Sequence, residues 1–188
     1  MSKPPKKYAL VGTSCVGKTT LVHKLSDLLH KDLPGIHIEV IEEAARIYFT
    51  YNKTDQPFSY FHQLQIQTLA KLQEQMAYFK NPHITLTDRS VLDAIAYVKA
   101  MGENSFAAKL LSKEKDWLPS YSHFFLLDPK GIPYKTDAVR NENKETRENF
   151  HKVFLDLLRT YKLPHTLVSG TLDARLNTIV QIIYSQLL

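Results

Sequence analysis

The chain has 188 residues, of which 44% are hydrophobic and 23% charged, and its formal net charge is +5. These values are typical of one soluble globular domain with a sizeable core. No apolar run approaches the roughly 18 residues that a membrane-spanning helix needs. The apolar run after the basic N-terminus ends at Gly12, too soon for a signal peptide, and the single cysteine excludes an internal disulfide. We therefore expect a cytoplasmic protein without a membrane partner.

The first predicted element is a short apolar strand over residues 8–11, which runs into a phosphate-binding loop (P-loop). The loop matches the pattern G-x-x-x-x-G-K-[ST] in full. Its residues are Gly12, Thr13, Ser14, Cys15, Val16, Gly17, Lys18 and Thr19. Apolar side chains at helical spacing follow as far as His30, so the motif lies at a strand-to-helix turn.

This position suits the chemistry of a P-loop. Successive backbone N–H groups and the positive end of the helix converge there on an anion. We expect the loop, with Thr20 after it, to bind ATP. Lys18 would reach the β- and γ-phosphates as a catalytic group, and the Thr19 hydroxyl would be a ligand of Mg²⁺.

A second strand and an aromatic connector follow. Residues 36–41 alternate as a strand that ends in Glu42 and Glu43, with Arg46 shortly after. A carboxylate at this place can act as a base for an acceptor hydroxyl or form a hydrogen bond with it. The connector includes Tyr48, whose ring could stack on a base. We take these four polar and aromatic residues as candidate substrate-binding groups.

The third predicted strand ends at Asp88, the acidic residue that is best placed to act at the phosphates. A helix over 60–80, which lacks Gly and Pro, precedes a strand over 83–87 that ends at Asp88 and Arg89. Residues 90–93 then have the S-x-x-D form of a capping box, which predicts the start of the next helix.

Asp88 and Arg89 are predicted to be catalytic. Asp88 could hold a water of Mg²⁺ beside Thr19, as part of the metal site, or accept the proton of a substrate hydroxyl. Arg89 could bind a substrate phosphate or hydroxyl, or stabilise the transition state.

The rest of the chain predicts further helices and strands in alternation, and a lid. The remaining elements are a short helix and loop over 103–120, a strand over 121–127, a helix over 146–161, a strand over 165–168 and a helix over 172–188. The polar stretch over 128–147 is a candidate lid. Its Arg140 is the first choice for an arginine that closes over the transferring phosphate, ahead of Arg147 and Lys135.

Strands that alternate with helices predict an α/β protein. We expect the three-layer P-loop NTPase fold, with a five-stranded, mainly parallel sheet and helices on both faces, as a single domain over residues 1–188. Ligands of such sheets bind outside the carboxyl ends of the strands. The P-loop, the Glu42–Glu43 pair, Asp88 and the start of the lid all follow predicted strands, so we expect them to meet at one edge.

With these residues assembled, the chain resembles the P-loop AAA-type domain shared with ribosylnicotinamide kinases (the NadR/Ttd-like group). The resemblance rests on G-T-S-C-V-G-K-T at 12–19, E-E-A-A-R at 42–46, T-D-R-S at 87–90 and Y-K-T-D-A-V-R at 134–140. It implies binding of ATP and Mg²⁺ and, for the kinase members, transfer to a nucleoside-like hydroxyl. Deoxynucleoside and thymidylate kinases carry an element similar to Asp-Arg-Ser at 88–90 after a strand, and we regard them as related families.

The favoured function is therefore a small-molecule kinase, acting as a monomer or homodimer, that transfers the ATP γ-phosphate to a nucleoside or nicotinamide-riboside-like acceptor. The alternative is an ATPase or a nucleotide-dependent switch, for which GTP is also possible. Residues 52–55 match the guanine-reading N-K-x-D and residues 128–131 match D-x-x-G, but their order is the reverse of that in GTPases. The basic residues are scattered, so a nucleic-acid partner is not expected.

Overall fold

The computed structural model describes residues 5–132 and 144–187, apart from the side chain of Lys144. The strands are β1 (Lys6–Val11), β2 (Ile38–Ile41), β3 (Ile84–Asp88), β4 (His123–Leu127) and β5 (His165–Val168). The helices are α1 (Lys18–Asp32), α2 (Ala44–Tyr51), α3 (Tyr60–Phe79), α4 (Val91–Ala100), α5 (Asn104–Glu114), α6 (Lys144–Thr160) and α7 (Leu172–Leu187), with a 3₁₀ turn at Leu118–Ser120. None of the described helices is long and apolar enough to cross a membrane.

The five strands form one parallel sheet in the order β2-β3-β1-β4-β5. The predicted α/β fold with a five-stranded parallel sheet is thus confirmed. Because β1 is the central strand, the chain leaves the middle of the sheet directly into the P-loop. The register aligns Leu10 of β1 with Asp88 of β3, and the Arg89 N–H donates to the Leu10 carbonyl at 3.0 Å. This pairing fixes Asp88 and Arg89 beside the start of the P-loop.

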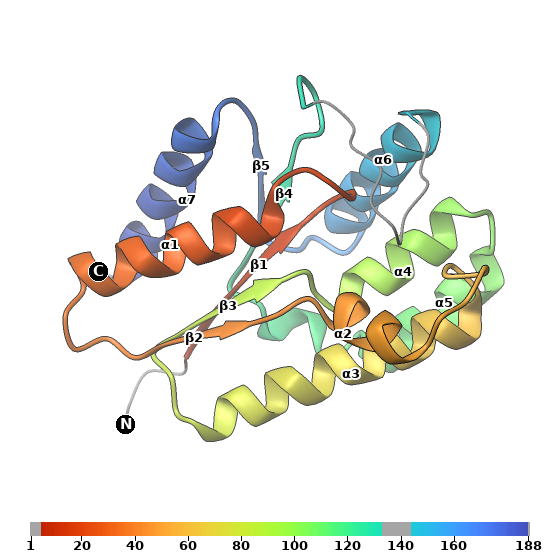
Figure 1. The fold of residues 1–188 in the computed structure, drawn as a ribbon, viewed down its shortest axis with the longest axis horizontal. Helices are drawn as coiled ribbons and strands as arrows, with labels where there is room; N and C mark the ends of the chain where they lie inside the picture. Colours follow the sequence, from red (N-terminus) through yellow and green to blue (C-terminus); the bar gives the residue numbers. More distant parts are fainter. Residues whose placement is uncertain (1–4, 133–143, 188) are drawn as a thin grey trace.

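Helices cover both faces of the sheet (Figure 1). Alternate residues of β1 and β4 belong to two different core clusters, because successive side chains of a strand point to opposite faces. Ala9 and Phe124 pack in the cluster that includes residues of α4, α5 and α6. Leu10 and Phe125 pack in the cluster that includes residues of α1 and α7. All four side chains are fully buried, so the two central strands form a rigid floor for the loops at their carboxyl ends.

The predicted capping box is present at the start of α4. The Ser90 hydroxyl accepts a hydrogen bond from the Leu92 N–H at 3.2 Å, and the Asp93 carboxylate accepts one from the Ser90 N–H at 2.8 Å. These bonds satisfy N–H groups that the first turn of a helix leaves without intrahelical partners. They also fix the backbone directly after Arg89.

The main difference from the predicted elements is α2, which forms where only an aromatic connector was expected. Its aromatic residues weaken the helical signal, and most of its residues lie in partial or full contact with solvent. Two strands are also shorter than predicted, with β2 beginning at Ile38 and β4 at His123. Of the candidate lid, residues 133–143 lie outside the described part of the chain, so Arg140 and Lys135 cannot be placed.

The two buried clusters predict a clear contrast between strand leucines. Leu126→Ala removes a side chain that is fully buried in β4, so it should lower the free energy of unfolding by about 2–5 kcal/mol. The matched control is Leu167→Ala in β5, where the side chain is 45% exposed and the loss should be about 1 kcal/mol or less. Urea unfolding followed by circular dichroism measures both. Equal losses would contradict the packing described for β4.

Candidate active site

The P-loop connects β1 to α1 through two glycines with positive φ angles. Gly12 has φ +133° and Gly17 has φ +86°, a region that side chains with a Cβ rarely adopt. A Cβ built at Gly12 would lie 3.1 Å from the Leu127 carbonyl oxygen of β4, so that position also needs glycine for space. Between them Cys15 takes φ +56°. The loop is therefore a strained turn held close to the neighbouring strand.

The N-terminus of α1 is suited to binding an anion. The helix begins at Lys18, and its N-cap residue Gly17 provides no side-chain hydrogen bond to the first N–H groups. Its first turn also contains no acidic residue. Uncapped N–H groups and the positive end of the helix dipole favour a negatively charged group at this point.

Lys18 is folded back over this loop. Its Nζ donates hydrogen bonds to the carbonyl oxygens of Gly12 at 3.0 Å and Thr13 at 2.6 Å. The side chain is buried, and this burial, together with the nearby positive charge of Arg89, lowers the pKa of Lys18 to about 7. An anion in the loop would favour the protonated ammonium and provide a stronger acceptor than the two carbonyls.

Thr19 and Asp88 meet beside Lys18. The Thr19 hydroxyl donates to Oδ2 of Asp88, which comes from the end of β3. Oδ1 of Asp88 is buried and has no hydrogen-bond partner among the residues that the structure describes. A hydroxyl and a carboxylate with an unused oxygen are the ligand types that Mg²⁺ prefers. The two residues therefore fit the predicted magnesium site.

Arg89 lies at the centre of a buried charge network. Its Nε donates to Oε1 of Glu43 at 2.7 Å, and its Nη1 donates to Oδ1 of Asp93 at 3.0 Å and to the Tyr97 hydroxyl at 3.1 Å. Nη2 is buried without a partner in the described part of the chain. Burial alone would lower the pKa of Arg89, but Glu43, Tyr97 and Asp93 hold it well above its ordinary value. Arg89 thus stays charged with one donor available.

Three cavities adjoin these residues. One of about 200 Å³ lies over the P-loop and is also lined by Glu43 and Arg46. Two small cavities, of about 30 and 20 Å³, are both lined by Arg89 and Asp93. The first of these is lined by aromatic rings, among them Phe58 and Tyr97, which stack with centroids 5.5 Å apart. Arg89 thus lines the small aromatic recess, and its partner Glu43 lines the cavity over the phosphate-binding loop.

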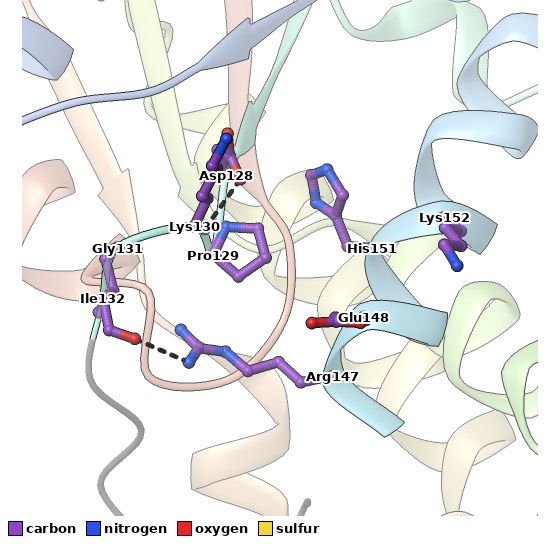
Figure 2. Close-up of a pocket in the computed structure, with 9 residues that line it drawn as sticks. All are labelled: Asp128, Pro129, Lys130, Gly131, Ile132, Arg147, Glu148, His151 and Lys152. Atoms are coloured by element: carbon purple, nitrogen blue, oxygen red, sulfur yellow. Dashed lines mark hydrogen bonds between the residues drawn. The ribbon is translucent and has the colours of Figure 1, made fainter. Parts of the chain in front are cut away.

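A larger cavity of about 560 Å³ lies on the other side of the P-loop, between the residues after β4 and α6. Figure 2 shows Arg147 reaching from α6 to the Ile132 carbonyl, where its Nη1 donates at 3.1 Å. The Nε of the same side chain donates to the Thr13 hydroxyl of the P-loop at 3.4 Å. One turn further along α6, Nδ1 of His151 is buried without a partner among the described residues. The volume is within the range of small-molecule sites.

A family model described as an AAA domain matches residues 7–175 of the chain. The chain belongs to the AAA domain family. No curated protein sequence matches this AAA domain at a significant level. Its similarity to known proteins is therefore seen in the family match and in the fold.

Solved structures with a similar fold include two thymidylate kinases and NadR. Thymidylate kinase from Candida albicans matches with a TM-score of 0.73 and 17% identity, over 99% of this AAA domain and 94% of that chain. Thymidylate kinase from Ehrlichia chaffeensis matches with a TM-score of 0.67 and 14% identity, over 96% and 100%. NadR in complex with NAD and AMP-PNP matches with a TM-score of 0.71 and 17% identity, over 97% of this chain and 49% of NadR. The chain thus spans about half the length of NadR.

Within this AAA domain, the fold brings several of the predicted site residues together. Lys18, Thr19, Asp88, Arg89 and Glu43 are joined by hydrogen bonds or lie in one charge cluster. The roles predicted for them stay predictions.

Other predicted residues lie at the margin of this cluster. Arg46 is largely exposed but lines the P-loop cavity, and its Nε lies 3.7 Å from Oε2 of Glu43. Glu42 is exposed and pairs with His23 at 3.4 Å, and the Tyr48 hydroxyl lies 2.9 Å from Nδ1 of His62.

Three residues of this arrangement carried no functional prediction from the sequence. Asp93 and Tyr97 lie four and eight residues after Arg89, a helical spacing that places them on the face of α4 toward its guanidinium. That spacing could have revealed them. Arg175 of α7 donates to the carbonyls of Val16 at 3.2 Å, Asp128 at 2.8 Å and Gly170 at 2.9 Å. No local pattern marks the role of Arg175, because its partners Val16 and Asp128 lie 159 and 47 residues away along the chain.

The lowered pKa of Lys18 predicts a pH dependence of stability. Unfolded lysine keeps its proton to about pH 10.5, whereas folded Lys18 loses it near pH 7, so the unfolded chain binds more protons between these values. This group's contribution to the free energy of unfolding should therefore rise with pH, by up to about 1.4 kcal/mol per pH unit. Urea unfolding of the native protein and of Lys18→Met at pH 7, 8 and 9 isolates it. A difference between the two proteins that does not change with pH would contradict the burial of Lys18.

Proposed function

We propose that the protein is an ATP-dependent kinase that transfers the γ-phosphate to a hydroxyl of a small nucleoside-like acceptor, either a nucleoside or a molecule such as nicotinamide riboside. The observation that carries this proposal is the position of Asp88 and Arg89. Asp88 is hydrogen-bonded to Thr19 of the phosphate-binding loop, Arg89 lines the aromatic recess, and each has one buried polar atom that lacks a partner among the described residues. A site that only bound a nucleotide would not need the unpartnered Arg89 donor beside that recess.

The donor half of the site would be built from the P-loop. The N-terminus of α1 would bind the phosphates, and Lys18 would exchange the carbonyls of Gly12 and Thr13 for β- and γ-phosphate oxygens. Thr19 and Asp88 would hold Mg²⁺, which when bound draws charge from those oxygens. The nucleoside part of ATP would occupy the cavity of Figure 2. Arg147 lines this cavity and also donates a hydrogen bond to the Thr13 hydroxyl of the P-loop.

The acceptor half would lie on the other side of Arg89. The acceptor oxygen attacks the γ-phosphorus, the new P–O bond forms, the bond to the β–γ bridging oxygen breaks, and ADP leaves. The hydroxyl proton would pass to a carboxylate. Asp88 would accept it at Oδ1, while its other oxygen, Oδ2, faces Thr19 at the metal site. Nη2 of Arg89 would bind the acceptor and help neutralise the transferring phosphate. Among the other predicted groups, Glu43 positions Arg89, and Arg46 lies at the entrance to the cavity over the loop.

The similar folds support this proposal in a coarser form. Two are thymidylate kinases, and NadR was crystallised with NAD and AMP-PNP. At sequence identities of 14–17%, these folds do not identify the acceptor molecule, and an experiment has to identify it.

An acceptor panel tests the reaction. With Mg-ATP, the protein should form ADP only when a nucleoside or nicotinamide riboside is added, and the phosphorylated acceptor should appear in equal amount by mass spectrometry. Lys18→Ala should abolish this turnover while the protein keeps its fold, and Lys24→Ala, an exposed position of the same helix, serves as the control. Hydrolysis that ignores every acceptor would favour an ATPase. Selective GTP binding with little turnover would favour a switch.

Asp88 gives a separate test of the chemistry. Asp88→Asn keeps the shape of the side chain but removes its charge and basicity, so we expect kcat to fall by about 10²–10⁴-fold. The Kd for ATP, measured by calorimetry in the absence of Mg²⁺, should change only a few-fold, because the phosphates bind mainly to the P-loop. Asp116→Asn, at an exposed position, is the control. Unchanged kcat would remove Asp88 from the chemistry.

A further inference from the structure

A further large cavity lies at the end of the sheet opposite to the P-loop, and it is called the amino-end cavity below. Its volume is about 510 Å³, within the range of small-molecule sites. It is lined by Lys6 and Lys7 of β1, Thr85 of β3 and Ser122, which directly precedes β4. These residues lie at the amino ends of three neighbouring strands, whereas the P-loop and Asp88 lie at the carboxyl ends. The proposed reaction uses none of the residues that line this cavity.

The walls of the amino-end cavity offer flat apolar surfaces. They include the indole of Trp117, the phenol ring of Tyr78 and the rings of Pro5 and Pro119. Tyr78 lies near the end of α3 and is 63% exposed, so its side chain is accessible to a ligand. Trp117 is held in place, because its Nε1 donates to Oε2 of Glu74 at 2.8 Å. Surfaces of this kind favour an aromatic ring.

The charges that line the cavity favour an anion. Among the lining residues that the structure describes, Lys6 and Lys7 are positive and only Glu74 is negative. The carboxylate of Glu74 is already engaged, since it accepts hydrogen bonds from Nζ of Lys7, Nε1 of Trp117 and the Tyr121 hydroxyl. It therefore offers little to a cation, and one positive charge of the cavity stays without a partner of opposite sign.

Lys7 has donors to spare. A lysine ammonium has three N–H groups, and in the described part of the chain Glu74 is the one hydrogen-bond partner of Nζ. The rings of Trp117 and Tyr121 have centroids 4.6 and 3.9 Å from Nζ, and they attract its charge less strongly than an anion would. Burial lowers the pKa of Lys7, although Glu74 opposes this effect. An anion close to Nζ would favour the protonated ammonium.

Ser122 offers a second donor beside the backbone of Lys7. Its hydroxyl accepts a hydrogen bond from the Lys7 N–H at 3.2 Å and donates to no other residue of the described ranges. A carboxylate has two oxygens and can accept from an ammonium and a hydroxyl together. One buried lysine compensates one negative charge, so a monoanion suits this cavity better than a phosphate dianion.

We propose that the amino-end cavity is a binding site for a small planar aromatic carboxylate. The ring of the ligand would lie against Trp117 and Tyr78, and its carboxylate would accept hydrogen bonds from Lys7 and Ser122. This site goes beyond the proposed kinase reaction and does not rest on it, because none of the candidate catalytic residues lines the cavity.

The single tryptophan of the chain gives a specific test. Its indole N–H produces one nitrogen–proton NMR signal, and this group donates to Glu74, which also lines the cavity. The probe is biphenyl-4-carboxylate, with the neutral biphenyl-4-carboxamide as its control. The carboxylate should shift the Trp117 signal, and its Kd by calorimetry should be lower than that of the carboxamide by about 10-fold or more, because the amide lacks the charge that pairs with Lys7.

Two tyrosines provide a matched pair of variants. Tyr78→Ala removes one wall of the cavity and should weaken binding of the carboxylate by about 5-fold or more. Tyr161→Ala, where the side chain is 44% exposed just after α6, should leave the Kd unchanged. Lys7→Gln keeps a donor for Glu74 but removes the charge, so it should abolish the preference for the carboxylate over the carboxamide. Thermal unfolding shows whether each variant still folds.

Competition with a nucleotide decides where the probe binds. With a saturating non-hydrolysable ATP analogue, the carboxylate should still shift the Trp117 signal, and Lys18→Ala should bind the probe as the native protein does. Loss of turnover and loss of this site are therefore separate results. Displacement by the analogue would place the acid at the P-loop and overturn the proposal. So would a Trp117 signal that does not move at millimolar probe, a carboxamide that binds equally well, or a Tyr78→Ala variant with native affinity.

Discussion

The candidate site depends on one buried guanidinium. Arg89 joins the end of β2 through Glu43, the start of α4 through Asp93, and the P-loop through the Gly12 carbonyl at 3.4 Å. It does so from a backbone with φ +79°, a conformation that costs a non-glycine residue on the order of 1–2 kcal/mol. A buried cation must be paired, so these three segments can pack together only in the arrangement that surrounds it.

The positive charge of Arg89 also affects Lys18 in the phosphate-binding loop. Lys18 and Arg89 are two buried cations in one cluster, and their repulsion adds to burial in lowering the pKa of Lys18. The lysine donates hydrogen bonds to two carbonyls of its own loop. A triphosphate relieves this conflict because it supplies negative charge to both cations. The repulsion between the two cations should therefore strengthen the binding of an anion at this loop.

How much could be predicted from the sequence differs between residues. The P-loop, the capping box at Ser90 and the strand ending at Asp88 were all recognised, because each is a local pattern whose partners lie within a few residues. The helix α2 was missed, because its exposed aromatic residues resemble a connector. The contact of Arg175 with Val16 was also missed, since it joins residues that are 159 positions apart along the chain. Arg140 stays a prediction because it lies outside the described residues.

The sequence by itself determined the fold class and the phosphate-binding loop, because hydrophobic periodicity and the glycine pattern act over short distances along the chain. Tertiary structure decided which acids and bases face one another. Both Glu42 and Glu43 follow β2, yet only Glu43 turns inward to Arg89, while Glu42 pairs with His23 at the surface. It also brought Lys7 beside Glu74, which lies 67 residues further along the chain. The physical reason is the same in each case: strand order and helix packing bring distant side chains together, and no local pattern contains that information.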